Sequence, residues 1–99
     1  MNNTKWNELR LAMYALSLAP VWSTLSTKGY QSRPDREWFY HFSDGGYDTI
    51  LHVDIFAENP DHRELIRSAL RKVHIPGEET TDGFRVFGYL RDGQIADFV

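Results

Sequence analysis

The chain has 99 residues, of which 41% are hydrophobic and 14% aromatic, so it can bury one core and is expected to form a single compact domain over residues 1–99. It has no cysteine, which excludes disulfides, thiolate nucleophiles and cysteine-based metal sites. The net charge of −3 is concentrated in residues 33–58, where six acids outnumber two arginines, and this excess disfavours a phosphate-binding role for that segment.

The N-terminal segment up to Pro20 predicts a helix. Apolar side chains recur at spacings of three and four residues, at Trp6, Leu9, Met13 and Leu16. Asn3 or Thr4 is the expected N-cap, and Pro20 is the expected stop. Glu8 and Arg10 interrupt the apolar run, which argues against a signal peptide. No apolar stretch is long enough to span a membrane, so we expect a cytoplasmic protein.

The next segments predict three strands. Residues 21–26 (VWSTLS) have the pattern of a short strand, and residues 27–36 are expected to form a loop. Residues 37–42 and 47–56 predict a hairpin, turned at residues 43–46 by two glycines. The expected register places His41 opposite Asp48 and Glu37 opposite His52.

Residues 59–61 (NPD) predict the start of a second helix, with a capping side chain, a proline at the first helical position and an acid in the first turn. Its expected buried stripe is Leu65, Ile66, Ala69, Leu70 and Val73. The helix is expected to end at residues 74–77. After a loop at 78–83, residues 84–90 predict a strand, and a turn at Asp92 and Gly93 leads to a last strand at 95–99.

The expected order is helix, three strands, helix, two strands, which is typical of the α+β class. We expect a single domain with an antiparallel sheet of about four or five strands and two helices on one face. The other face of the sheet is then partly open. Aromatic side chains on such a face suit a binding surface.

The acids of the central segment indicate a surface for a basic protein partner, because complementary charge steers association. Nearby aromatic side chains supply apolar anchors. The expected partner-binding residues are Asp35, Glu37, Trp38, Tyr40, Asp44, Tyr47, Asp48 and Asp54. A solvated hairpin with acidic edges explains the same residues without a partner.

An enzyme is a second hypothesis. His41 and His52, each placed opposite an acid, would suit a small hydrolase or an RNase-like enzyme, with Ser43 or Tyr40 as the neighbouring hydroxyl. No catalytic motif, metal-ligand spacing or phosphate loop is present in the sequence. We therefore expect no catalytic residue, no metal ion and no cofactor.

A nucleic-acid adaptor is the third hypothesis. The second helix carries a basic side formed by Arg63, Arg67, Arg71 and Lys72, which would suit phosphate contacts. Asp61 and Glu64 offset this charge, and a solvated basic face is common on helices.

Three stretches, KWNELRLAMYAL, REWFYHFSDGGYDTILHVDI and VHIPGEETTDGFRVFGYL, resemble small bacterial immunity proteins of contact-dependent growth inhibition and related toxin systems. The resemblance implies a cytosolic, mildly acidic α+β protein that binds one cognate toxin and blocks its active site or substrate surface. Toxins of these systems are often nucleases, whose basic grooves would complement an acidic patch. The expected partner is therefore a nuclease-type toxin, with neither membrane nor nucleic acid bound directly. A homodimer through the open sheet face is the remaining alternative.

Overall fold

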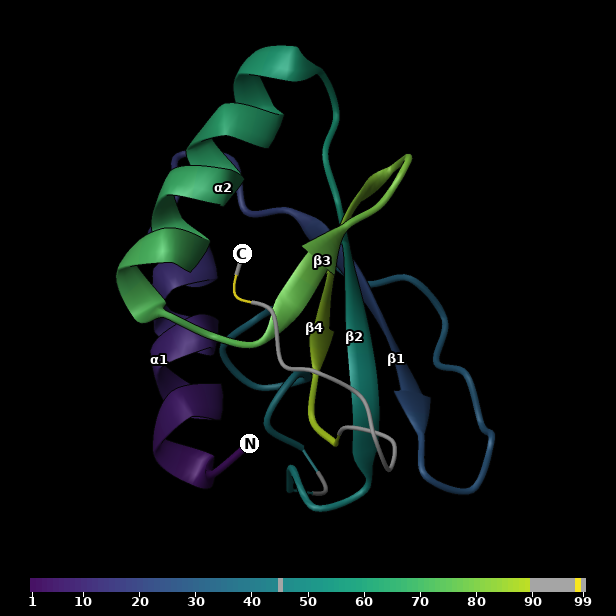
Figure 1. The fold of residues 1–99 in the computed structure, drawn as a ribbon. Coiled ribbons are helices and arrows are strands. Elements are labelled where there is room, and N and C mark those ends of the chain that lie inside the picture. Colours follow the sequence, from purple (N-terminus) through teal and green to yellow (C-terminus); the bar gives the residue numbers. More distant parts are fainter. Residues whose placement is uncertain (45, 90–97, 99) are drawn as a thin grey trace.

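The computed structural model describes residues 1–44, 46–89 and 98. These residues form the elements α1 (Asn3–Tyr14), β1 (Val21–Ser26), β2 (Ile50–Phe56), α2 (Pro60–Val73), β3 (Gly77–Glu79) and β4 (Gly83–Phe87). The strands make one antiparallel sheet in the order β1-β2-β4-β3, and both helices lie on one face of it (Figure 1). The predicted α+β fold, with two helices and an antiparallel sheet, is confirmed.

Both helices begin at a capping side chain. At α2, the Asn59 side chain accepts a hydrogen bond from the backbone N–H of His62 (2.8 Å), and Pro60 follows as the first helical residue, as predicted. His74 ends α2 in the left-handed conformation, with φ 61°. At α1, the cap is Asn2, whose side chain accepts from the backbone N–H of Lys5 (2.9 Å), so the prediction of Asn3 or Thr4 is wrong by one or two residues.

The core lies between the sheet and the helices. Val53 and Ile55, two residues apart on the central strand β2, share the face toward the helices and are fully buried. Ile55 pairs in register with Trp22 of β1 and Phe84 of β4, so the same face continues across three strands. The helices complete the core with the buried side chains Trp6, Leu9, Met13, Ile66, Leu70 and Val73. The prediction that Leu65 is buried is wrong: it is 50% exposed, because it lies off the stripe formed by Ile66, Leu70 and Val73.

The predicted strand at 37–42 is wrong. Residues 38–44 form successive turns, and Trp38 and Phe42, four residues apart, both point into the core with ring centroids 4.6 Å apart. The Nε1 of Trp38 also donates to the carbonyl of Pro20 (2.8 Å). A helical spacing of four buries both rings on one side, whereas a strand would also have put Tyr40, which is exposed, on that side.

Because residues 37–42 do not form a strand, β2 pairs with other strands than the prediction gave it. This strand begins at Ile50 rather than at residue 47, and its neighbours are β1 and β4. His52 therefore pairs in register with Leu25 and Phe87. The predicted pairs of His41 with Asp48 and of Glu37 with His52 are not formed.

The C-terminal part of the sheet also departs from the prediction. Residues 77–79, expected within the loop that ends the helix, form β3 and pair with β4, which itself ends at Phe87 rather than at residue 90. The predicted turn at Asp92 and Gly93 and most of the predicted strand at 95–99 lie outside the described residues. Phe98 makes an antiparallel bridge with Pro76, next to β3.

Candidate partner-binding surface

Residues 35–44, which include the buried Trp38, are held in place by the carboxylates of Asp35 and Glu37. The Oδ1 of Asp35 accepts the backbone N–H groups of Arg36 (2.7 Å) and Glu37 (2.9 Å). The Oε1 of Glu37 accepts those of Tyr40 (2.6 Å) and His41 (3.0 Å). Each carboxylate thus caps backbone donors that the turns leave unpaired, and this fixes the position of the acidic groups.

His41 lies among these acids. Its Nδ1 is 2.7 Å from Oδ2 of Asp35. That hydrogen bond, with the charges of Asp35, Glu37 and Asp44, raises the pKa of His41. The backbone N–H of Glu37 and then His41 lower the pKa of Asp35, and the backbone N–H of Tyr40 is the first cause that lowers the pKa of Glu37. These two carboxylates are therefore ionised at neutral pH.

Three exposed aromatic rings come from the same turns and from the end of α1. The Phe39 ring lies 5.4 Å from the ring of Tyr14 and 4.8 Å from that of Tyr40, so the rings form a continuous row from α1 to the turns. The guanidinium of Arg10 sits 5.0 Å from the centre of the Phe39 ring and donates to the Phe39 carbonyl. We call this region the aromatic–acidic surface and define it by Tyr14, Asp35, Glu37, Phe39, Tyr40 and Asp44.

The structure brings four of the eight predicted partner-binding residues to this surface: Asp35, Glu37, Tyr40 and Asp44. Trp38 and Tyr47 are only 1% and 7% exposed, because their rings pack with Phe42 in the core, so this structure does not present them as anchors. Asp54 lies on β2, where it binds Arg85 through Oδ1 (2.8 Å) and Oδ2 (3.3 Å). Asp48 is exposed beside Tyr89, whose hydroxyl donates to the Asp48 carbonyl (2.6 Å).

Tyr14 and Phe39 were not among the predicted binding residues. Tyr14 stands off the buried stripe of α1, and an aromatic residue outside the stripe was a usable signal of exposure. The spacing of four between Trp38 and Phe42 carried a second signal. A helical spacing in that segment turns both Phe39 and Tyr40 away from the core, whereas the predicted strand placed Tyr40 on the same face as Trp38 and Phe42.

The histidines do not assemble into the predicted enzyme-like pairs. The hydroxyl of Ser43, one of the two proposed as a neighbour of His41, donates instead to the carbonyls of Phe39 (3.2 Å) and Tyr40 (3.1 Å). His52 lies on β2 with its Nδ1 3.9 Å from Oδ1 of Asp54, and burial, then the charge of Arg85, lowers its pKa. Among the residues the structure describes, no three metal-ligating side chains come together.

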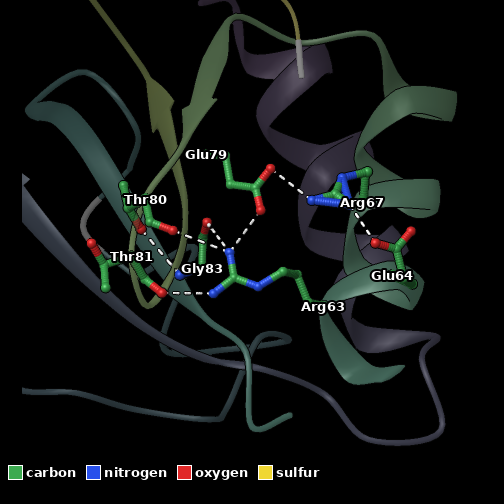
Figure 2. A network of polar contacts seen from close by, with 7 residues as sticks. All are labelled: Arg63, Glu64, Arg67, Glu79, Thr80, Thr81 and Gly83. Carbon is green, nitrogen blue, oxygen red and sulfur yellow. Dashed lines mark hydrogen bonds and ion pairs between the residues drawn. The ribbon is translucent and has the colours of Figure 1, made fainter. Parts of the chain in front are cut away.

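Part of the basic side of α2 is engaged within the fold (Figure 2). Arg63 donates through Nη1 to Oε2 of Glu79 (2.9 Å) and to the carbonyl of Thr80 (3.1 Å), and through Nη2 to the carbonyl of Thr81 (2.7 Å). Arg67 bridges Glu64 and Glu79. Two of the four cations proposed for nucleic acid therefore tie α2 to the turn between β3 and β4.

Neither helix in the described part of the chain is long and apolar enough to cross a bilayer. Comparison with known sequences gives one family: the model described as "Family of unknown function (DUF6678)" matches residues 1–93. No curated protein and no solved structure matches the chain.

Proposed function

We propose that this chain, which belongs to the family of unknown function DUF6678, binds and neutralises a cognate basic protein, a nuclease-type toxin, in the cytoplasm. The observation that carries the proposal is the aromatic–acidic surface, where a row of exposed rings and the ionised carboxylates of Asp35 and Glu37 belong to the same turns, with the backbone N–H of Tyr40 donating to Glu37. The resemblance of the sequence to immunity proteins supports the choice of a toxin as partner.

The two kinds of side chain have separate roles in this proposal. Tyrosine supplies much of the binding energy of protein interfaces, because its ring buries a large area at little entropic cost while its hydroxyl stays hydrogen-bonded. The ionised carboxylates complement the cations with which a nuclease holds phosphates, and they steer the encounter. Occupying those cations would keep the nucleic acid out of the toxin's groove.

Rigidity of the surface favours tight binding. The carboxylates of Asp35 and Glu37 are fixed by backbone donors, and Trp38 anchors the segment in the core from beneath. Groups that are ordered before association cost less conformational entropy when the complex forms. A surface of this kind suits a protein that must inhibit a toxin at low concentration.

The experiment starts with the tagged protein in its own host. A pull-down read by mass spectrometry identifies the partner, and the purified partner is then titrated with the wild type, Tyr40→Ala and Tyr30→Ala. Tyr30 is a matched control, because it is 72% exposed against 71% for Tyr40, and it lies at the opposite end of β1 from Asp35. We expect Tyr40→Ala to weaken binding by about 2 kcal/mol, roughly thirtyfold, and Tyr30→Ala to leave it unchanged.

Asp44→Asn tests the electrostatic part. Asp44 is exposed, so its loss should slow association more than it speeds dissociation, and the effect should shrink as salt is added. The toxin claim is tested separately, by asking whether co-expression protects cells from the captured partner and whether the purified pair loses nuclease activity. The proposal would be contradicted by a partner that binds the wild type, Tyr40→Ala and Tyr30→Ala equally, or by a partner that is not toxic to cells.

A further inference from the structure

Besides the aromatic–acidic surface, the outer side of the pair of helices is an exposed surface with apolar side chains. α1 and α2 lie side by side and antiparallel (Figure 1), and between them runs a groove of about 580 Å³. Its floor is lined by small side chains, among them Ala12, Ala15 and Ala69. Leu11 and Leu65 line it as well and are 47% and 50% exposed, so the surface combines large apolar side chains with a hollow of similar chemistry.

The outer stripe of α2 is complementary to itself. Asp61, Leu65, Ser68 and Lys72 are all exposed and follow at spacings of four, three and four, which places them along one side of the helix. They stand symmetrically about the point midway between Leu65 and Ser68. If the stripe meets an antiparallel copy of itself, each Asp61 faces a Lys72 and each Leu65 faces a Ser68.

On α1, Leu11 and Ala12 are neighbours in sequence and both line the groove, so an antiparallel copy centred between them sets a large side chain against a small one here too. The two midpoints lie at about the same level along the antiparallel helices. Lys5 Nζ donates to the Val73 carbonyl (2.6 Å), which sets Lys5 of α1 beside Val73 of α2. The midpoint of α1 is as many residues from Lys5 as the midpoint of α2 is from Val73. A single two-fold axis therefore serves both helices.

From the symmetry of the α2 stripe and the common level of the two midpoints, we propose that two copies of the chain associate through their α1–α2 faces, as a two-fold dimer with a four-helix interface. The axis lies in the interface, perpendicular to the helices, and each helix packs antiparallel to its own copy. Leu11 and Leu65 of each protomer fill the hollow of its partner, and the Asp61–Lys72 pairs close both ends. The dimer uses the helix face, in contrast to the open sheet face considered from the sequence.

The first test measures mass. Sedimentation equilibrium of the full chain, across low to high micromolar concentrations, is expected to give twice the mass of one chain. Leu65→Lys should leave a monomer of unchanged circular dichroism, since its side chain is half exposed in one protomer. Tyr30→Lys, a change of the same kind on the exposed loop after β1, should remain dimeric. A monomeric wild type, or a dimer that survives Leu65→Lys, would overturn the proposal.

The second test reverses the charges. In Lys72→Glu, each new carboxylate would face Asp61 of the partner, so the variant should weaken the dimer at least fivefold. Lys28→Glu, on the loop after β1, should not weaken it. Adding Asp61→Lys to Lys72→Glu should restore dimerisation to within about threefold of the wild type. Failure of the double variant to recover, with its helices intact by circular dichroism, would rule out this register. Dissociation caused by Phe87→Lys but not by Leu65→Lys would assign the dimer to the sheet face instead.

Discussion

His41 shows how a single residue acquires its chemistry from the fold. In sequence it is six residues from Asp35, and nothing in a spacing of six predicts contact. The turns of residues 38–44 bring the imidazole back over the segment that carries Asp35 and Glu37, and the carboxylate of Asp35 becomes its partner. Backbone N–H groups of the same segment donate to the carboxylates of Asp35 and Glu37. One set of hydrogen bonds therefore positions both the histidine and its partner.

The pKa of His41 provides the prediction at this scale. Because its folded-state pKa lies above the usual 6.5, the stabilisation from the pair is complete below about pH 6.5 and is lost as pH rises through the folded pKa. For Asp35, whose pKa is lowered, stabilisation is present above the usual 3.8 and is lost as pH falls through the folded value. The pair therefore contributes most between these limits.

Proton NMR titration of the histidine rings measures this directly. We expect His41 to titrate above 6.5 in the wild type and to move down in Asp35→Asn. His52 should titrate below 6.5 in both proteins, since burial is the main cause of its shift. If His41 keeps the same pKa in Asp35→Asn, the hydrogen bond to Asp35 is not its cause.

At the scale of elements, α2 shows how an amphipathic helix uses its polar side. Its buried apolar residues Ile66, Leu70 and Val73 pack in the core. Arg63 reaches the turn between β3 and β4, where it binds two backbone carbonyls and Glu79 (Figure 2). β3 has only three residues, too few to hold an edge strand by its own pairing. The arginine therefore stabilises both the helix position and the short edge strand.

Arg63→Lys tests this role while keeping the charge. Lysine cannot reproduce the planar, multiple donation of a guanidinium, so we expect a loss of about 1–2 kcal/mol in the free energy of unfolding. Arg71→Lys is the control on the same helix, because Arg71 is exposed, and it should change stability by less than about 0.5 kcal/mol. Urea denaturation measures both variants. Equal stability of the two would mean that the Arg63 contacts contribute nothing net.

At the scale of the whole molecule, the three tryptophans join distant parts of the chain in one core. Trp6 comes from α1, Trp22 from β1 and Trp38 from the turns after the loop, and all are buried. Phe42 contacts all three rings, with centroid distances of 5.9, 5.1 and 4.6 Å. The segment that carries part of the aromatic–acidic surface is thus continuous with the main core.

This continuity predicts a single cooperative transition. In urea, tryptophan fluorescence and far-ultraviolet circular dichroism should give the same midpoint, because the rings and the helices lose their packing together. A fluorescence transition at lower urea than the loss of helix would show that residues 35–48 open on their own, and would argue against a rigid binding surface.

α1 ends at Tyr14, before the predicted stop at Pro20. The sequence by itself determined that there are two helices, the start of α2, the position of β1 and the antiparallel α+β class. These follow from local signals, namely capping side chains, proline at the first turn and apolar spacing over more than two turns. The acidic character of the surface was also predicted from the composition, and four of its residues were among the predicted partner-binding residues.

Only the tertiary structure decided the form of residues 37–44. In this short aromatic run, the apolar residues fit both the alternation of a strand and the spacing of four of a helical turn, so the local pattern does not select between a strand and turns. The choice was made by burial: Trp38 and Phe42 pack beside Trp22 and Trp6 while Tyr40 between them stays exposed, whereas a hairpin strand would place all three residues on one face. That packing turned Phe39 and Tyr40 outward, buried Tyr47 and Trp38, and brought His41 to Asp35, because side-chain contacts between distant segments outweigh the weak preferences of eight residues.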